Sequence, residues 1–295
     1  MRILIFGGNG MLGHKLLQVL REDVEVWTTL RGSFADVEAF DLFEKPRCVA
    51  GVDVENVKCI RRAIVDVRPD VVINAVGIVK QRPSAKDTVS TLTVNSIFPH
   101  RLNELAAEFG FRLFCVSTDC VFDGVLGKYS ESDVSNATDL YGKSKNLGEV
   151  ISNNCLTLRT SIIGRELQTS HSLVEWFMSN RGKSVKGFSN AIYSGFPTIV
   201  LADIMKSLIL DHPAICGLYH VSSDPIDKYE LLQLTNIAYR LEITIERDEC
   251  FRIDRSLDST KFRNATGFVP ASWETMIGQM ANDPTPYELW RKRSN

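Results

Sequence analysis

The sequence is poor in three features that would assign it to other classes of protein. No apolar run reaches the roughly 18 residues that a transmembrane helix requires. The seven cysteines are scattered, odd in number and without a CxxC pair, which argues against a disulfide framework and a structural zinc site. The formal net charge is only −2, so no overall field attracts nucleic acid or an anionic membrane. We therefore expect a reduced cytoplasmic protein without a metal, nucleic acid or membrane as partner, and a first strand beginning at Arg2, with no room for a signal peptide, fits this expectation.

The chain does have enough apolar residues for a sizeable core, and they fall in short runs between helical segments. Of its 295 residues, 44% are hydrophobic. Strands are predicted at 2–6, 24–29, 71–76, 112–117 and 155–160. Helices are predicted at 11–21, 57–67, 92–109, 140–152, 171–180, 199–210 and 228–240. This alternation predicts an α/β fold with a Rossmann-type, doubly wound parallel sheet.

The alternation of strands and helices weakens after about residue 165. The stretch 165–198 is richer in Ser, Gly and Asn, and a further strand is predicted at 217–222. We therefore expect an NAD(P)-binding Rossmann domain over 1–165 and a smaller substrate-binding lobe over 166–295, partly interleaved with it. In such sheets ligands bind in the crevice at the carboxyl ends of the strands.

The segment GGNGMLG at residues 7–13 follows an apolar run and precedes leucines at helical spacing. Its glycines allow a tight turn and a close approach of the backbone to a pyrophosphate, which the N–H groups and dipole of the new helix bind. The spacing is GxxGxxG rather than GxGxxG, so its position after an N-terminal strand carries the prediction of a dinucleotide site. The predicted contacts are Gly7, Gly10, Met11, Leu12 and Gly13.

The end of the second predicted strand favours NADPH, with NADH as the alternative. In this fold an acid there prefers the free ribose of NAD, whereas an arginine accommodates the 2′-phosphate of NADP. The strand VEVWTTLRG ends without an acid and carries Arg31, which is otherwise a solvated surface residue. Asp53 and Val54 follow the next apolar run, either near the adenine or in a plain turn. Small residues then leave backbone room beside the cofactor: Asn74, Ala75, Val76 and Gly77.

Tyr141 and Lys145 in YGKSK lie four residues apart, so they share one helix face, and Asp139 is the expected N-cap. A tyrosine has an ordinary pKa near 10, and an ammonium and an oxidised nicotinamide beside it both favour the phenolate. Tyr141 is therefore predicted to give a proton to an alkoxide formed by hydride delivery. Thr118, just past the fifth strand, is predicted to fix the carbonyl oxygen.

Together these residues resemble the extended short-chain dehydrogenase/reductase superfamily, and within it the dTDP-4-dehydrorhamnose reductases and related nucleotide-sugar 4-keto reductases. The matching segments are GGNGMLG, NAVG, STDCVFDG, GKYSESD, YGKSKNLGE, LRTSIIG and RSLDSTKFRNATG. The resemblance implies Thr118, Tyr141 and Lys145 as the catalytic set. It adds Asn95 and Ser117 to the cofactor side, where Tyr141 and Lys145 also belong, and it implies a homodimer built on the helices 92–109 and 140–152.

Two positions depart from the pattern of the rhamnose reductases. Cys120 stands where they usually have tyrosine, and Ser256 follows Arg255 where they often have proline. In related epimerase–reductases a cysteine at the position of Cys120 acts as an acid or base. It is paired there with a histidine whose place in the sequence is similar to that of His171. A thiolate and an imidazole on opposite faces of a 4-keto sugar would exchange a proton at C3 or C5. The alternative is that Cys120 packs as a small apolar residue and His171 caps or binds a hydroxyl.

Four basic residues are candidates for the diphosphate or base of a nucleotide. Lys80 and Arg82 follow the fourth strand, and Lys186 and Arg255 lie in the second lobe. Each is otherwise a solvated charge. With Thr118, Cys120, Tyr141 and His171, the residues Lys80, Lys186 and Arg255 complete the predicted substrate site.

Three functions follow from these patterns. The first is NAD(P)H-dependent reduction of the 4-keto group of a nucleotide-linked 6-deoxyhexose, a UDP-2-acetamido-2,6-dideoxy-hexos-4-ulose or dTDP-4-dehydrorhamnose, in surface-polysaccharide synthesis such as that of O-antigen. The second adds 3,5-epimerisation by Cys120 and His171. The third is a non-catalytic NADP-binding regulatory subunit, against which the intact Thr118, Tyr141 and Lys145 argue.

Overall fold

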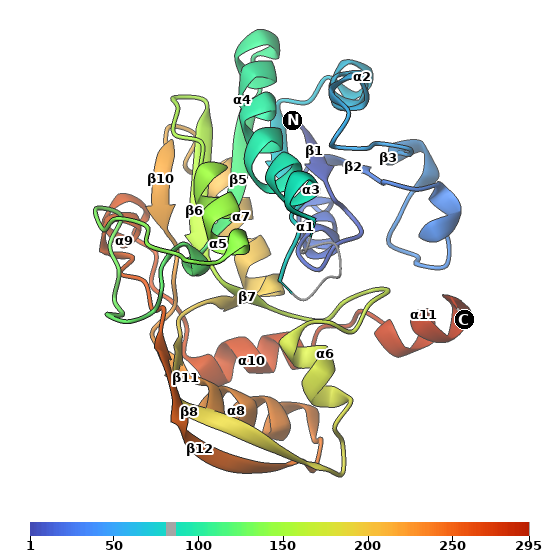
Figure 1. Cartoon of the computed structure of the whole chain (residues 1–295). Coiled ribbons are helices and arrows are strands. Elements are labelled where there is room, and N and C mark those ends of the chain that lie inside the picture. Colours follow the sequence, from blue (N-terminus) through green and yellow to red (C-terminus); the bar gives the residue numbers. More distant parts are fainter. Residues whose placement is uncertain (81–86, 295) are drawn as a thin grey trace.

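The computed structural model describes residues 1–80 and 87–294 and is built on a seven-stranded parallel sheet (Figure 1). The spatial order of its strands is β10-β6-β5-β4-β1-β2-β3. Their bounds are β1 Arg2–Phe6, β2 Glu25–Thr29, β3 Cys48–Val49, β4 Val71–Asn74, β5 Arg112–Thr118, β6 Cys155–Thr160 and β10 Gly217–His220. Every pairing in this sheet is parallel, so the carboxyl ends of the strands share one edge.

Helices cover both faces of this sheet. The side chains of β1 point alternately to opposite sides and are apolar on both, so each face has a core to cover. Ile3 and Ile5 join a core with α1 (Gly13–Leu20) and α7 (Thr198–Leu210). Leu4 and Phe6 join a second core with α2 (Val57–Val67) and α4 (Phe98–Phe109). The prediction of a Rossmann-type, doubly wound α/β fold is therefore confirmed.

The second lobe is built around a three-stranded sheet in the order β11-β8-β12 (Figure 1). Its strands are β8 Ser184–Tyr193, β11 Ile226–Asp227 and β12 Thr244–Asp254, with a short pair β7 Ile162–Ile163 and β9 Phe196–Pro197 beside them. The remaining helices are α3 Thr88–Leu92, α5 Leu140–Leu147, α6 Leu173–Met178, α8 Lys228–Tyr239, α9 Thr260–Thr266, α10 Trp273–Ala281 and α11 Tyr287–Ser294. Short 3₁₀ turns are η1 Phe34–Asp36, η2 Lys45–Arg47 and η5 Asp119–Val121. The chain crosses between the two parts more than once, since α7 and β10 follow residue 165 yet pack on the main sheet.

Two predicted helices differ from the observed ones. The helix predicted at 140–152 ends at Leu147, and Gly148 after it packs so closely on the Asn95 carbonyl that a β-carbon would come within 1.9 Å of that oxygen. The helix predicted at 92–109 is in fact α3, a π-helical turn η4 (Thr93–Ile97) and α4 in succession. Pro99 has no N–H to donate to the Asn95 carbonyl, which explains why regular α-helical bonding is interrupted here.

The C-terminal segment is bound to the first helix through buried polar contacts. His14 Nδ1 donates to the Gly10 carbonyl at 2.8 Å, and its Nε2 accepts from the Tyr287 hydroxyl at 2.8 Å. Lys15 forms a buried ion pair with Asp283. Because burial is the main cause, the pKa of His14 is lowered to about 3. The helix α11 therefore supports the glycine-rich turn from behind.

This neutral histidine predicts how stability changes with pH. A group whose pKa is depressed in the folded state takes up protons on unfolding, so its contribution is present above the unfolded pKa near 6.5 and is lost below it. We expect His14 to cost about 1.4 kcal/mol of unfolding free energy for each pH unit below 6.5. Urea denaturation at pH 5 to 8 checks this, and His14→Gln should flatten the dependence. An equal slope in the variant would contradict the assignment.

Candidate active site

The glycine-rich turn joins β1 to α1 in a conformation that side chains would block. Gly7 has φ of +85°, in the left-handed region that favours glycine. The Gly10 N–H donates to the Gly7 carbonyl at 3.0 Å, and a β-carbon on Gly13 would lie 2.1 Å from that same oxygen. No side chain caps the start of α1 at Leu12. The exposed N–H groups and the tightly packed glycines therefore fit the pyrophosphate of a dinucleotide.

The ends of β2 and β4 flank this turn. The Gly7 N–H donates to Thr29 Oγ1 at 3.3 Å, and a β-carbon on Gly7 would contact Val76 Cγ2 at 2.9 Å. The Asn74 side chain accepts from the Val76 N–H at 3.0 Å, which ends β4 two residues before its predicted end. Arg31 is exposed just past β2. Its role, like those of Asp53 and Val54, stays a prediction.

Asn95 fastens the segment after β4 to the helix that carries the catalytic motif. Its Oδ1 accepts from the Ile78 N–H at 2.8 Å, and its Nδ2 donates to the Ile78 carbonyl at 2.9 Å and to Ser144 Oγ at 3.1 Å. Asn95 lies in the π-helical turn η4, a feature often found at functional sites. It therefore positions backbone on the predicted cofactor side and also fixes α5.

Thr118 and Tyr141 are brought together because α5 packs directly on η5. A β-carbon on Gly142 would lie 2.2 Å from the Cys120 carbonyl, so only glycine permits this approach. Asp139 caps α5 by accepting from the Gly142 N–H at 2.9 Å. At this contact the Thr118 hydroxyl lies close enough to the Tyr141 hydroxyl to act on its pKa.

The electrostatics of this pair favour a neutral phenol. Burial raises the pKa of Tyr141 above its usual range, the Cys120 thiol adds to the rise, and the neighbouring Thr118 hydroxyl opposes it. The expected preference for the phenolate is thus outweighed within the protein by burial. Lys145 is buried, its Nζ donates to the Val116 carbonyl at 2.7 Å, and burial lowers its pKa. Tyr141 therefore holds a proton that it can donate.

Cys120 contacts an arginine of the second lobe. Arg255 Nη1 lies 3.6 Å from Cys120 Sγ, and Arg255 Nε donates to the Phe122 carbonyl at 2.9 Å. Burial, followed by the charge of Asp119, raises the pKa of Cys120 to about 11, so the thiol is protonated at neutral pH. His171 is exposed before α6, and its backbone N–H donates to Glu166. Across residues 1–80 and 87–294 no contact joins Cys120 to His171, so their pairing stays a prediction.

The two lysines predicted to bind substrate lie in different surroundings. Lys80 Nζ forms an ion pair with Asp139 at 2.8 Å and lies 5.7 Å from the centre of the Tyr141 ring. Lys186 is exposed on β8 and is paired with Asp248 at 3.0 Å. The structure therefore places Lys80 and Arg255 at the catalytic motif, whereas Lys186 contacts an acid on the neighbouring strand β12. Arg82 lies outside the described residues.

Lys228 is a residue of this site that sequence reasoning missed. It is the first residue of α8, and its Nζ lies 4.1 Å from the centre of the Tyr193 ring. Its charge interacts with Asp119 and Cys120. From the sequence alone, a lysine at the start of a helix reads as a solvated charge.

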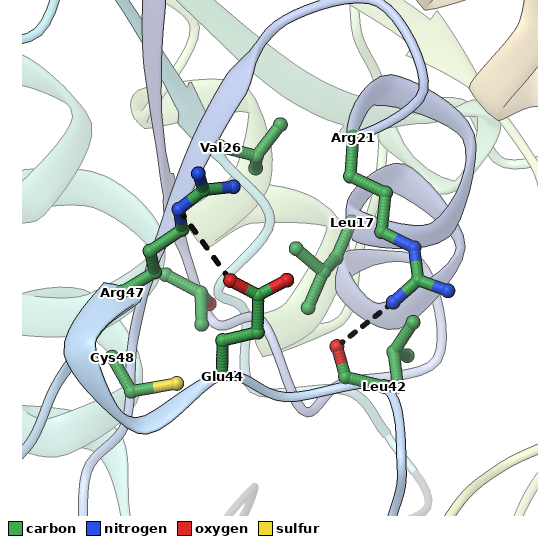
Figure 2. Close-up of a pocket in the computed structure, with 8 residues that line it drawn as sticks. Leu17, Arg21, Val26, Leu42, Glu44, Arg47 and Cys48 are labelled. Carbon is green, nitrogen blue, oxygen red and sulfur yellow. Dashed lines mark hydrogen bonds and ion pairs between the residues drawn. The ribbon is translucent and has the colours of Figure 1, made fainter.

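Neither of two cavities coincides with this motif. One, of about 10 Å³, has room for about one water and lies between α1, β2 and the segment 42–48 (Figure 2). Arg21 and Glu44 reach into it from opposite sides, and Cys48 lies at its edge. The other, of about 480 Å³, lies where α6 meets α11, and its charged lining is Arg165, Glu175, Arg181, Glu288 and Arg291. Among the residues that the structure describes, no group of His, Cys, Asp and Glu could hold a metal, and no helix is long and apolar enough to span a bilayer.

The parallel sheet, the glycine-rich turn and the Tyr–Lys helix define a Rossmann-type protein of the extended short-chain dehydrogenase/reductase class. More narrowly, residues 1–285 match the model of the RmlD substrate binding domain, and the chain belongs to that family.

Named relatives include a dTDP-4-dehydrorhamnose reductase of Aggregatibacter actinomycetemcomitans, 27% identical over 94% of this chain and 97% of the relative. The methionine adenosyltransferase 2 subunit beta of Xenopus laevis is 30% identical over 81% of this chain and 72% of its own. A crystal structure of a hypothetical dTDP-4-dehydrorhamnose reductase from Sulfolobus tokodaii superposes with a TM-score of 0.77 and 26% identity, covering 93% of this chain and 98% of that one. The fold is also that of the Bacillus anthracis dTDP-4-dehydrorhamnose reductase in complex with NADP, at 21% identity over 95% of this chain and 98% of that one, with a TM-score of 0.77.

Proposed function

We propose that this protein is a nicotinamide-dependent reductase of the 4-keto group of a nucleotide-linked 6-deoxyhexose, of the dTDP-4-dehydrorhamnose type. The neighbouring side chains of Thr118 and Tyr141, at the same sheet edge as a turn that fits a pyrophosphate, carry this proposal. Similarity to a reductase along almost the whole of both chains supports it. A UDP-linked 2-acetamido-6-deoxy sugar is the alternative substrate that we propose within this chemical class.

The residues of the site divide the reaction between them. A nicotinamide cofactor, when bound, supplies the hydride that reduces the carbonyl carbon. Tyr141 donates its proton to the carbonyl oxygen as that oxygen gains negative charge, and takes it back in the reverse direction. The Thr118 hydroxyl donates to Asp119 in the structure, and with substrate bound it would turn its proton to the same oxygen and so orient the carbonyl. Lys145 is held on the same face of α5, where its ammonium stabilises the phenolate that remains.

The glycine-rich turn predicts a large loss of cofactor binding in Gly13→Ala. The added β-carbon would lie 2.1 Å from the Gly7 carbonyl and 2.9 Å from Gly8 Cα, so backbone must move where the pyrophosphate binds. We expect the Kd for NADPH, the cofactor that Arg31 favours, to rise by roughly 100-fold, because each 1.4 kcal/mol of lost interaction is tenfold in affinity.

A glycine without close neighbours provides the matched control. Gly278 lies inside α10, and a β-carbon there would meet nothing within 4 Å. Gly278→Ala should leave the Kd for NADPH unchanged and raise the unfolding free energy by up to about 1 kcal/mol. Fluorescence titration of NADPH measures both variants, and equal affinities in the two would show that the turn does not bind the cofactor.

The proposed reaction is tested by following NADPH oxidation with dTDP-, UDP- and GDP-linked 4-keto-6-deoxy sugars. Consumption with one of them, and a product reduced at C4, would establish the reductase and name its nucleotide. Tight binding of NADPH without turnover on any of these sugars would contradict the proposal.

A second candidate function is that of an accessory subunit of another enzyme. The similarity to the methionine adenosyltransferase 2 subunit beta favours it, since that relative is 30% identical. Co-purification with an adenosyltransferase, together with absent turnover on every keto sugar, would support this function. The protonated Tyr141 beside Thr118 favours the reductase.

A further inference from the structure

The imidazole of His14 links the glycine-rich turn to the C-terminal helix α11. This side chain is fully buried, with Nδ1 2.8 Å from the Gly10 carbonyl oxygen and Nε2 2.8 Å from the Tyr287 hydroxyl. A carbonyl oxygen only accepts, so Nδ1 carries the proton, Nε2 accepts, and the Tyr287 hydroxyl donates. Burial lowers the pKa of His14 to about 3, so the ring is neutral at pH 7 and keeps this arrangement.

The oxygen that the imidazole holds belongs to the peptide group between Gly10 and Met11. The same oxygen accepts from the His14 backbone N–H at 3.1 Å, so both of its lone pairs are directed at α1. In a trans peptide group the C=O and N–H bonds point in opposite directions. The Met11 N–H is therefore turned away from α1, toward the space before its first turn. Across residues 1–80 and 87–294 this N–H donates to no backbone acceptor, so it is available to an anion.

The ring of Tyr287 is held by charged groups of α1 and of the segment that leads into α6. Two cations lie over it, with Lys15 Nζ at 4.9 Å and the Arg165 guanidinium at 4.7 Å from the ring centre. Lys15 forms a buried ion pair with Asp283, and Arg165 Nε donates to the Glu175 carboxylate at 2.6 Å. The tyrosine hydroxyl is thus presented to the imidazole from a well-packed support.

We propose that Tyr287 and His14 are positioning residues for the nicotinamide cofactor. Through the Gly10 carbonyl they aim the Met11 N–H at its pyrophosphate. This inference rests on the proposed function, because the reductase needs a dinucleotide whose pyrophosphate the turn would bind. It adds a requirement that the motif GGNGMLG does not contain, since the hydroxyl that fixes the turn comes from the other end of the chain.

The physical basis is the directionality of the hydrogen bond between a backbone N–H and a phosphate oxygen. Such a bond weakens steeply when the donor is misaligned, and its strength comes from the charge on the acceptor. A peptide group that is already held in one orientation binds without first being ordered. A turn that has lost this support must be ordered by the cofactor itself, which lowers the affinity.

The test is Tyr287→Phe, measured by fluorescence titration of the full chain with NADPH, or with NADH if that is the cofactor bound. The variant leaves Nε2 without its donor, so the imidazole proton can move to Nε2 and the Gly10 carbonyl is no longer secured. We expect the Kd to rise by about 3- to 10-fold, the effect of losing one hydrogen bond between neutral groups.

Tyr239→Phe is the matched control. The Tyr239 hydroxyl also makes one hydrogen bond to a backbone carbonyl, that of Met280 at 3.1 Å, but it joins α8 to α10 in the second lobe. Urea denaturation should give a similar loss of stability in the two variants, whereas only Tyr287→Phe should raise the Kd. A merely structural role would change stability in both and affinity in neither.

Two substitutions of His14 show whether the tyrosine acts through the imidazole. His14→Leu removes both hydrogen bonds and should raise the Kd by about 10-fold or more. His14→Gln keeps an amide donor for Gly10 and an acceptor for Tyr287, so its Kd should stay within about threefold of the wild type. Adding Tyr287→Phe to His14→Leu should raise the Kd no further, because the link is already broken.

The outcomes separate this proposal from the proposed function. A wild-type Kd in Tyr287→Phe, or an equal rise in Tyr239→Phe, would overturn the positioning role and leave the reductase standing. So would a further rise on adding Tyr287→Phe to His14→Leu. A wild-type chain that binds neither NADPH nor NADH would overturn both. Should His14→Leu fail to fold, the two tyrosine variants still decide, and none of these readings needs turnover.

Discussion

Replacing Tyr141 with phenylalanine is expected to lower turnover by about 10²- to 10⁴-fold, the usual contribution of a positioned proton donor. The variant lacks the hydroxyl that burial keeps protonated beside Thr118. The ring remains between α5 and η5, so binding of the cofactor and of the nucleotide should be unchanged. Steady-state NADPH oxidation with the accepted keto sugar gives kcat, and calorimetry gives the two affinities.

The control for this substitution is Tyr219→Phe. Tyr219 lies on β10 beside Phe262, with Lys261 over its ring, and belongs to no part of the predicted site. Tyr219→Phe removes the same hydroxyl oxygen as Tyr141→Phe does, but outside the predicted site. Its kcat should therefore match that of the wild type. A kcat within threefold of the wild type in Tyr141→Phe would show that another group supplies the proton.

The main sheet was predictable because its central strands are buried on both faces. Such strands contain continuous apolar runs, as in β1 and β4, and their signal needs no tertiary context. The strands of the second lobe give no such signal. β8 contains glycine and asparagine, and β12 is mostly exposed and rich in charge, so each gains its conformation from pairing with the other.

The same distinction applies to the candidate site. Thr118 ends a predicted strand, and Tyr141 and Lys145 share a turn of a predicted helix, so local spacing was enough to identify them. Lys228 lies over the ring of Tyr193 only because α8 packs on β8 of the second lobe, and periodicity carries no information about that packing. His171 shows the opposite case, since a motif position alone placed it in the site and the structure gives it an exposed setting.

A buried ion pair beneath the catalytic segment carries the second large prediction. Arg159 on β6 binds Glu149 with two hydrogen bonds, Nε to Oε1 at 2.7 Å and Nη2 to Oε2 at 2.6 Å. Both side chains are only 6% exposed. Ser117, next to Thr118, donates to the same carboxylate at 2.6 Å, and Arg159 Nη1 donates to the neutral His220 ring at 3.2 Å. The pair therefore links β5, β6 and β10 under the site.

Arg159→Met is expected to lower the free energy of unfolding by about 3–5 kcal/mol, because it leaves the buried Glu149 carboxylate without its counter-ion. Replacing both partners, as in Arg159→Met with Glu149→Leu, should recover much of this loss, since no uncompensated charge remains. Urea denaturation gives the unfolding free energies, and Arg61→Met, which breaks an exposed pair with Glu108, should leave the midpoint close to that of the wild type. If the double variant were as unstable as Arg159→Met alone, the loss would come from packing of the arginine stem and not from a stranded charge. Turnover of Arg159→Met and of the double variant is then measured at a temperature where both stay folded. This separates the effect of the pair on stability from its effect on the position of Ser117, because Ser117 loses its acceptor only when Glu149 is replaced.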